Sequence, residues 1–431
     1  MKKNFIALTI AMLLSSCLPQ DTQIPQSPLL PLLERKSGLI VYVGIDGNMY
    51  YSDQAGRSPT QITTDAHEPA DASNSFRYYQ FPTWSRDGNQ VAFVGLSIEG
   101  DATTSDIFVH DLNLETTTKV YSSLTEFPFY INWSPDNANV GFIATTAQQN
   151  NIVLQSVPSG GGERTIIDTG SPYYWSWSPD GSVVIAHTGS QQTSSPDHFS
   201  FLRIDDEITE YGLDISPATF QAPAWSPDGS LIALTHASDK GNQIIVTDPA
   251  GLNQKTIGTF VSKTAFAWSF DSTRLAYLNA LQTMANGTVG ALHIYDINTE
   301  TETVEDGDII AFFWSPDGEK IAYYTLVPIP SNGAQTEATP QQYAVQLYIL
   351  NLETGESKNI FSYRPTEQFL NILPYFDQYH QSTTIWSPDS NNLVISFLDG
   401  ENNPGIAVVA ASGQLAPRIL AEGYIGFWSW E

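Results

Sequence analysis

This sequence of 431 residues is poor in cysteine and in basic residues. Because Cys17 is the only cysteine, no disulfide bond can form within the chain. Lys and Arg number 18 against 46 Asp and Glu, which gives a net charge of −28. A surface of that sign repels nucleic acids, so we expect no nucleic-acid partner. Solubility is the first interpretation of this acidity, and cationic ligands or divalent ions are the second.

Linear motifs that carry chemistry are missing as well. The sequence has no Gly-x-Ser-x-Gly elbow, HExxH, P-loop, GxGxxG, EF-hand loop or cysteine cluster, and its seven histidines are scattered. We therefore expect no catalytic motif and no cofactor. Two acidic groups, residues 205–207 and 305–308, could hold Ca²⁺, but solvated turns are the favoured interpretation.

The N-terminus has the pattern of a secretory leader. Lys2 and Lys3 precede an apolar run over residues 5–14, which is too short to span a bilayer. Residues 18–36 contain four prolines and three glutamines, which favour an extended tether over a helix or strand. We predict a signal peptide over 1–16, a tether over 17–36 and a folded domain over 37–431.

A Trp-Ser-Pro-Asp-Gly stretch recurs through the rest of the chain. Successive copies lie 42 to 49 residues apart, apart from one step of 72, and this period is typical of propellers and solenoids. We interpret each Trp as a wedge between repeats and each Asp as a turn residue. Two copies have Ser at the Gly position, Ser272 and Ser390, and there we predict a different turn. The copies start at Trp84, Trp133, Trp177, Trp225, Trp268, Trp314, Trp386 and Trp428.

Each repeat holds four short β-rich runs separated by turn residues, which predicts one propeller blade. Residues 38–44, 48–53 and 59–63 match the second, third and fourth strands of a blade that lacks its first strand. Residues 424–430 match a first strand with nothing after it. We therefore predict an all-β, eight-bladed propeller of four-stranded antiparallel blades. The C-terminal strand would pair with the three N-terminal strands and close the ring.

These motifs resemble two known groups. The WSPDG turn and the strand after it resemble the Pro-Asp propeller repeats of TolB-type proteins and of prolyl-oligopeptidase-family peptidases, over residues 37–431. The stretch Leu14-Ser15-Ser16-Cys17 resembles the lipobox of bacterial lipoproteins. That resemblance implies cleavage before Cys17, a diacylglycerol on its sulfur, and a location in the cell envelope outside the cytoplasm.

Blade topology puts the unusual sequence on the face opposite the WSPDG turns. Two insertions, residues 327–343 and 364–383, lengthen the repeat of Trp314, and we expect both to be loops on that face. Aromatic residues are frequent in the segments that lead into each Trp. An alternative interpretation is that these rings pack between blades or plug the channel. The candidate binding residues are Arg77, Tyr78, Tyr79, Tyr130, Tyr173, Tyr174, Tyr375, Tyr379 and His380.

Three functions stay open on these observations. The first is a lipid-anchored, monomeric binding or scaffolding module for a protein, peptide or glycan. The second is an enzyme acting on extracellular glycans or peptides, with residues gathered around the channel. The third is a sensor or assembly factor whose propeller spaces other components. A channel filled with aromatic rings favours the binding module, and a polar, solvent-connected channel with a His or Glu of perturbed pKa favours the enzyme.

Overall fold

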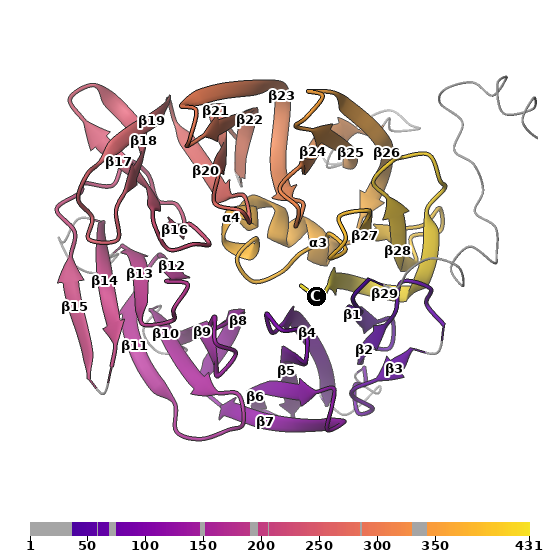
Figure 1. The fold of residues 1–431 in the computed structure, drawn as a ribbon. Helices are drawn as coiled ribbons and strands as arrows, with labels where there is room; N and C mark the ends of the chain where they lie inside the picture. Colours follow the sequence, from indigo (N-terminus) through magenta and orange to yellow (C-terminus); the bar gives the residue numbers. More distant parts are fainter. Residues whose placement is uncertain are drawn as a thin grey trace, which may run out of the picture.

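The computed structural model describes residues 37–57, 59–68, 75–146, 151–189, 197–205, 207–284, 287–329 and 343–431. In these ranges strands dominate, and the helical elements are α3 (Glu367–Ile372), the 3-10 helix η1 (Leu373–Tyr375) and α4 (Phe376–Tyr379). Figure 1 shows the sheets arranged around a common centre that holds α3 and α4. The fold is an all-β propeller. Cys17, the expected leader and the expected tether lie outside the described residues.

Four sheets stand apart from the rest, and each contains four antiparallel strands that follow one another in the chain. Hairpin connections of this kind are what the repeated turns predict. The strands of these sheets are β4 (Phe76–Trp84), β5 (Gln90–Glu99), β6 (Ala102–Asp111) and β7 (Thr116–Ser123); β8 (Glu126–Trp133), β9 (Asn139–Thr146), β10 (Ile152–Pro158) and β11 (Thr165–Gly170); β12 (Tyr173–Trp177), β13 (Val183–Thr188), β14 (His198–Ile204) and β15 (Ile208–Gly212); and β16 (Ala224–Trp225), β17 (Ile232–Ser238), β18 (Gly241–Thr247) and β19 (Lys255–Phe260).

The other strands form one ladder of 13. Three strands join its parts. Residues 301–305 of β23 pair with β22 and residues 309–314 pair with β24. β26 pairs with β25, and its last two residues, Arg364 and Pro365, pair with β27. β29 likewise pairs with β28 through its first half and with β1 through its second. The strands are β20 (Lys263–Trp268), β21 (Arg274–Met284), β22 (Gly287–Asp296), β23 (Thr301–Trp314), β24 (Lys320–Pro328), β25 (Tyr343–Asn351), β26 (Ser357–Pro365), β27 (Asn392–Leu398), β28 (Pro404–Ala410), β29 (Arg418–Trp428), β1 (Ile40–Gly44), β2 (Met49–Ser52) and β3 (Thr60–Gln61).

The last strand of the chain pairs with the first. In the antiparallel register of β29 and β1, Ile40 lies opposite Trp428 and Val43 lies opposite Ile425. β2 pairs with β1, and β3 pairs with β2. The run β29–β1–β2–β3 therefore contains the C-terminal strand beside the three N-terminal strands, as Figure 1 also shows for β29 and β1.

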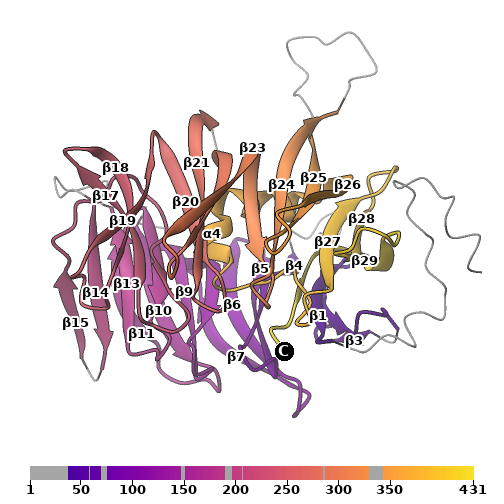
Figure 2. The same cartoon turned by 45° about the horizontal axis from the view of Figure 1, so that its top comes forward.

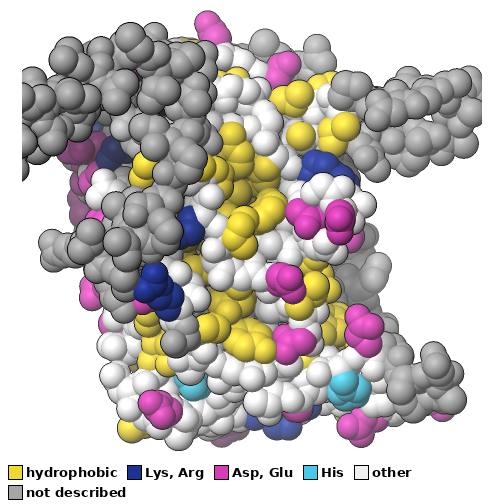
Figure 3. Space-filling view, turned by 90° about the vertical axis from the view of Figure 1, so that its right-hand side faces the viewer, with side chains coloured by type: hydrophobic (Ala, Val, Ile, Leu, Met, Phe, Trp, Pro, Cys, Tyr) yellow, Lys and Arg dark blue, Asp and Glu magenta, His cyan; other side chains and the backbone are white. Residues whose placement is uncertain are grey.

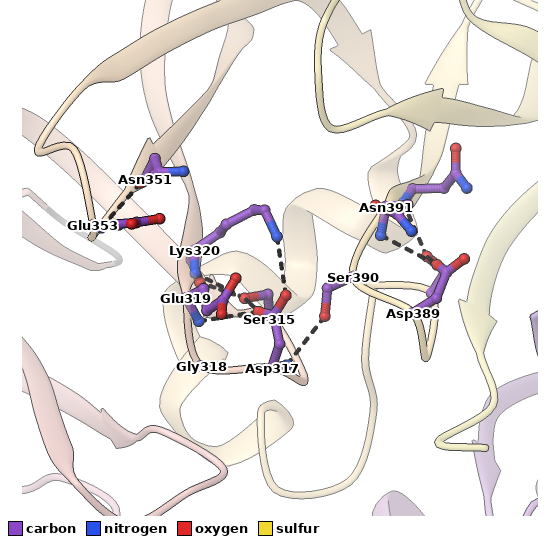
Figure 4. A network of polar contacts seen from close by, with 12 residues as sticks. Ser315, Asp317, Gly318, Glu319, Lys320, Asn351, Glu353, Asp389, Ser390 and Asn391 are labelled. Carbon is purple, nitrogen blue, oxygen red and sulfur yellow. Dashed lines mark hydrogen bonds and ion pairs between the residues drawn. The ribbon is translucent and has the colours of Figure 1, made fainter.

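Each repeated turn is held by its own serine and aspartate. In the turn after Trp314, the Ser315 hydroxyl donates to Asp317 at 2.5 Å and accepts from the Lys320 amide at 2.9 Å (Figure 4). The residue after the Asp has a positive φ in every copy, so the prediction of a different turn at the two serines is wrong. The values are 67° for Gly88, 60° for Asn137, 72° for Gly181, 73° for Gly229, 61° for Ser272, 69° for Gly318 and 58° for Ser390.

The three non-glycine residues at this position have a compensating hydrogen bond. Ser390 Oγ accepts from the backbone amide of Asp317 in the preceding turn at 3.1 Å (Figure 4). Ser272 accepts in the same way from Asp228 at 3.0 Å, and Asn137 accepts from Arg86 at 2.8 Å. A left-handed residue costs about 1–2 kcal/mol, and a hydrogen bond of this kind returns about 0.5–1.5 kcal/mol. The bond therefore offsets much of the strain and links neighbouring turns.

The tryptophans of the repeat lie where one unit meets the next. All of them are buried except Trp225, which is half-buried. In five units the indole N–H donates to the carbonyl that precedes the Trp of the unit before it. One of these bonds, Trp84 to Phe427, links β4 with the C-terminal strand. The bonds are Trp84 to Phe427 (3.2 Å), Trp133 to Thr83 (3.1 Å), Trp268 to Ala224 (3.0 Å), Trp314 to Ala267 (3.0 Å) and Trp386 to Phe313 (3.0 Å).

The insertion at 364–383 is folded into the centre of the ring. Its residues Phe369, Ile372, Leu373 and Phe376 are at most 3% exposed and belong to the main apolar core. Figure 2 shows α4 surrounded by strands. The expectation of a surface loop is wrong here, because these four residues recur at helical spacing and form one apolar face. Most of the other insertion, residues 330–342, lies outside the described residues.

The outer surface is mixed in character. Figure 3 shows the side that carries β27–β29 and β1–β3, where Asp and Glu side chains are spread around a strip of hydrophobic ones. Exposed apolar residues on these strands and turns include Ile419 at 60% and Ile45 at 44%. No helix in the described ranges is long and apolar enough to span a bilayer.

Candidate functional site

The first site is a cavity of about 610 Å³ between β4, the β1–β2 turn, α3 and β29, which we call the aromatic cavity. It lies at the Phe76 end of β4, whereas the WSPDG-type turn follows the other end of that strand at Trp84. The cavity therefore opens away from the repeated turns. Its walls include Ile45, Asp46, His67, Glu68, Phe76, Arg77, Tyr78, Tyr79, Gln80, Phe81, Gln368, Asn371, Ile372, Tyr379, Tyr424 and Ile425.

The first half of β4 supplies the aromatic wall. Phe76 and Tyr78 are two positions apart, so their side chains leave the strand on the same side. Their rings lie parallel, with centroids 5.7 Å apart and planes 12° apart. A bulge between Gln80 and Thr83 interrupts the pairing of β4 with β5. Phe81 in this bulge has φ of 54°, an outlier for a bulky residue, and strain of this kind is concentrated at functional sites.

Arg77 lies in this wall with its charge already paired. Its Nε lies 3.1 Å from Asp65 Oδ2 and donates to Tyr79 Oη at 2.9 Å, and its Nη2 lies 4.0 Å from Asp106. Burial alone would lower the pKa of Arg77, but the bond to Tyr79 and the two carboxylates hold it above its ordinary value. Lys119 adds a second cation 3.6 Å from Asp106. Arg77 therefore orders the wall rather than offering a free positive charge.

α3 forms the opposite wall. Thr366 caps the helix by accepting from the Phe369 amide at 3.4 Å, and Glu367 stands in the first turn, where the helix dipole favours an acid. Phe369 points into the core, so the cavity receives the exposed side chains of Gln368 and Asn371. The side-chain amides of Gln368, Asn371 and Gln80 make no hydrogen bond to any residue in the described ranges.

The aromatic cavity brings together four of the nine residues singled out in the sequence. Arg77, Tyr78, Tyr79 and Tyr379 line it, although they come from two elements far apart in the chain. His380 instead lines a second cavity. It is 8% exposed, and burial lowers its pKa to about 4.

The other four tyrosines line neither of these two cavities. Tyr130 is buried against the insertion and donates to the Gln378 carbonyl at 2.9 Å. Tyr173 is buried and donates to Asp168 at 2.8 Å, and the ring of Tyr174 stacks on Phe220. Tyr375 is 48% exposed. Tyr130, Tyr173 and Tyr174 therefore have partners within the protein. This agrees with the alternative interpretation, in which these rings pack between blades or plug the channel.

The second cavity has a volume of about 320 Å³ and lies at the centre of the ring, where residues of the repeated turns meet α4. We call it the channel cavity. Its polar lining includes Arg86, Asp377, His380 and Gln381. The α4 end of the insertion forms its wall, while the α3 end forms a wall of the aromatic cavity. One inserted segment therefore borders both cavities.

Asp377 is the strongest electrostatic anomaly in the channel cavity, and the sequence analysis missed it. It is 6% exposed, and burial raises the pKa of its carboxyl group to about 7, against an ordinary value of 3.8. Its Oδ1 accepts from the Gln378 amide at 3.0 Å. The signal in the sequence was an acid placed inside an apolar helical pattern, directly after Phe376.

Arg86 was missed as well. Its guanidinium lies 4.0 Å from the centre of the Trp430 ring and donates to the Gln381 carbonyl at 2.7 Å. Burial lowers the pKa of Arg86 to about 10. Arg86 replaces the Pro of the repeated turn, which is the signal that sequence analysis could have used.

Gln378 fixes the insertion between the two cavities. Its Oε1 accepts from the Trp175 amide at 3.2 Å, and its Nε2 donates to the Trp175 carbonyl at 2.9 Å and to Tyr130 Oη at 3.0 Å. These bonds tie α4 to β12 and to β8, so both cavities have a rigid common wall.

The two acidic groups considered as Ca²⁺ sites are residues 205–207 and 305–308. Asp206 lies outside the described residues, and Glu305 accepts a hydrogen bond from Tyr323 at 2.8 Å. Within the described ranges, no three His, Cys, Asp or Glu side chains gather in a way that could hold a metal ion.

No family model matches the sequence, and no curated protein matches it. Solved structures match the fold. A eukaryotic initiation factor structure has a TM-score of 0.51 at 13% identity, over 92% of this chain and 98% of that chain. A prolyl endopeptidase structure has a TM-score of 0.51 at 12% identity, over 80% of this chain and 49% of that chain. TolB from Acinetobacter baumannii has a TM-score of 0.35 at 14% identity, over 78% and 81%. The two matches with a TM-score of 0.51 show a shared fold, and identities this low show nothing about function.

Proposed function

We propose that this chain is an eight-bladed β-propeller, held outside the cytoplasm by a lipid on Cys17, that binds its ligand in the aromatic cavity. The observation that carries the binding function is the gathering of Arg77, Tyr78, Tyr79 and Tyr379 around one cavity of about 610 Å³. That volume lies within the range of small-molecule sites, and a rigid scaffold with aromatic walls is a common way to build one. Protein, peptide and glycan ligands are all compatible with the scaffold.

The pairing of strands supports eight blades and a closed ring. Five units are delimited by the repeated turns from Trp84 to Trp268, two more begin at Trp314 and Trp386, and the β29–β1–β2–β3 run supplies the eighth. The bond from Trp84 to Phe427 repeats the contact that joins neighbouring units elsewhere. Closure of this kind covers the edge of β1, which would otherwise be an open sheet edge of the kind that favours aggregation.

The anchor rests on the sequence alone. The lipobox-like stretch ends at the only cysteine, and residues 18–36 would lift the propeller off the membrane surface. Labelling cells with a radioactive fatty acid tests this proposal. Label should enter the wild-type protein and be absent from Cys17→Ala; equal labelling of both would contradict it.

Binding is tested by screening the labelled protein on arrays of glycans and of peptides, together with two tyrosine variants. Tyr78 lines the aromatic cavity, whereas Tyr375 is exposed but lines neither cavity, so Tyr375→Ala is the matched control. A ligand that Tyr78→Ala loses and Tyr375→Ala keeps supports the proposal. Ligands that both variants keep, or arrays without any ligand, count against it.

An enzyme remains the second candidate because of Asp377. A carboxyl group with a pKa of about 7 is suited to proton transfer near neutral pH. However, Asp377 is the only carboxylate among the described residues that line the channel cavity, and glycoside hydrolysis ordinarily needs a pair. Product release from a bound glycan or peptide that disappears in Asp377→Asn would favour the enzyme over the binding module.

A further inference from the structure

The charges around the aromatic cavity restrict what can enter it. Arg77 is the only Lys or Arg among the described residues that line the cavity, and Asp65 and Asp106 already neutralise it. The acidic wall residues are Asp46 and Glu68, and the whole chain carries a net charge of −28. An anionic ligand would therefore meet no free cation and an unfavourable field. Phosphorylated or acidic ligands do not fit this site.

Few carboxylate oxygens of the described lining are available to pair with a cationic ligand. Asp46 already accepts hydrogen bonds from the Asn48 amide at 3.1 Å, the Asn48 side chain at 2.8 Å and the Tyr50 hydroxyl at 2.8 Å. Burial acts to raise the pKa of Asp46, but these bonds hold it below its ordinary value. Its oxygens are thus occupied within the β1–β2 turn. Glu68 is the remaining acid among the described residues of the lining; it is exposed, and one exposed carboxylate contributes little binding energy.

What the cavity does offer is flat apolar surface beside neutral polar groups. Phe76 and Tyr78 form a parallel pair of half-buried rings. Across the cavity, Gln368 and Asn371 present amides that have no hydrogen-bond partner in the described part of the chain, and Gln80 presents a third. Each amide holds one acceptor oxygen and two donor hydrogens. A sugar hydroxyl is likewise a donor and an acceptor, while the C–H face of a pyranose ring packs on an aromatic ring.

From these walls we infer that the aromatic cavity binds an uncharged oligosaccharide, an inference that rests on the binding function proposed above. The sugar rings stack on Phe76 and Tyr78. The amides of Gln368 and Asn371 receive the hydroxyl groups from the α3 side. Arg77, held by its two carboxylates, fixes the wall and makes no ion pair with the ligand.

The test uses oligosaccharides that differ in charge. Titration calorimetry compares cellohexaose, laminarihexaose and maltohexaose with two charged probes, a hexagalacturonate and a fully deacetylated chitosan hexamer. Chitohexaose is the neutral counterpart of the chitosan hexamer. We expect binding of at least one neutral hexasaccharide, no binding of the anionic probe, and an affinity that does not change between low and high salt.

Three variants locate the bound sugar. Tyr78→Ala should weaken binding roughly tenfold or more, because it removes half of the stacking surface. Asn371→Leu should weaken binding severalfold, because it removes the side-chain amide. Since Leu is similar in size to Asn, the substitution changes little else at this exposed position. Tyr375→Ala should leave the affinity unchanged. Circular dichroism confirms that each variant is folded before it is titrated.

Four results would overturn the inference. The first is the absence of binding for every neutral hexasaccharide. The second is a charged probe that binds more tightly than its neutral counterpart and weakens with salt. The third is a protein or peptide ligand that Tyr78→Ala loses, which leaves the proposed binding site standing and removes only the sugar. A neutral hexasaccharide that binds Tyr78→Ala as tightly as the wild type would overturn both proposals.

Discussion

Ser429 Oγ accepts a hydrogen bond of 2.9 Å from the backbone amide of Leu39, 390 positions earlier in the chain. In the repeated turns the serine accepts from the amide five residues later, as Ser226 does from Leu231 at 3.0 Å. The reciprocal backbone bond is present too, from the Ser429 amide to the Leu39 carbonyl at 2.8 Å. The two ends of the chain thus rebuild the hydrogen bonds of one WSPDG-type turn.

Ser429→Ala should therefore lower the free energy of unfolding by as much as the same change in an unbroken turn. Ser429 and Ser226 are both at most 1% exposed, and each substitution leaves a backbone amide without its acceptor, at a cost of about 1 kcal/mol. Ser412→Ala, at an exposed serine, is the control. Urea unfolding of Ser429→Ala, Ser226→Ala and Ser412→Ala measures the three changes in the free energy of unfolding. An effect of Ser429→Ala no larger than that of Ser412→Ala would contradict the role of this contact in joining the two ends of the chain.

The left-handed serines give a second prediction. Ser390→Ala loses the bond to Asp317 and keeps the strained φ of 58°, so it should destabilise the protein by about 1 kcal/mol. Ser390→Gly loses the bond but removes the strain, so its unfolding midpoint should stay close to that of the wild type. If Gly and Ala at this position prove equally destabilising, backbone strain plays no part.

The inserted helix should behave as core. Phe369 is 1% exposed, and Phe369→Ala should cost about 3–5 kcal/mol through lost burial and a cavity. Leu370 is the adjacent residue of α3 and is 38% exposed, so Leu370→Ala should cost less than about 1 kcal/mol. Thermal unfolding of the two variants checks the difference. Similar melting temperatures would mean that α3 does not occupy the centre of the ring in solution.

Asp377 predicts an unusual pH dependence of stability. Its pKa is about 7 in the folded protein and 3.8 in an unfolded chain, so the folded state binds more protons between these values. The contribution of Asp377 to stability therefore falls as pH rises from about 4 to 7. Asp377→Asn keeps an acceptor for the Gln378 amide and removes the titration. Above pH 7 it should be more stable than the wild type, by up to ~4 kcal/mol.

Denaturant unfolding of wild type and Asp377→Asn across this pH range measures the difference. The two curves should meet near pH 4 and separate as the pH rises. Parallel curves would show that Asp377 titrates normally, and would also remove the electrostatic argument for the enzyme.

The sequence predicted the strands well because their signals are local. A Trp, a Pro-Asp turn and an alternating apolar run lie within a dozen residues, and the repeat shows each of them many times. The complementary fragments at the two ends predicted the pairing of β29 with β1 for the same reason, since each fragment matches part of the repeat. The lipid anchor on Cys17 stays a prediction.

The inserted helix has a local signal that the loop expectation overlooks, because Phe369, Ile372, Leu373 and Phe376 have helical spacing. Two other features cannot be predicted in this way. The turns at Ser272 and Ser390 depend on hydrogen bonds from the neighbouring unit, which a single repeat does not contain. The two cavities are made by residues hundreds of positions apart. Only a three-dimensional structure brings Tyr78 together with Gln368.

The most direct test of the proposed binding site is a crystal structure of the protein soaked with the neutral hexasaccharide that binds most tightly in calorimetry. The account predicts sugar density between the rings of Phe76 and Tyr78 and the amides of Gln368 and Asn371. Sugar density in the channel cavity beside Asp377, with the aromatic cavity empty, would contradict it.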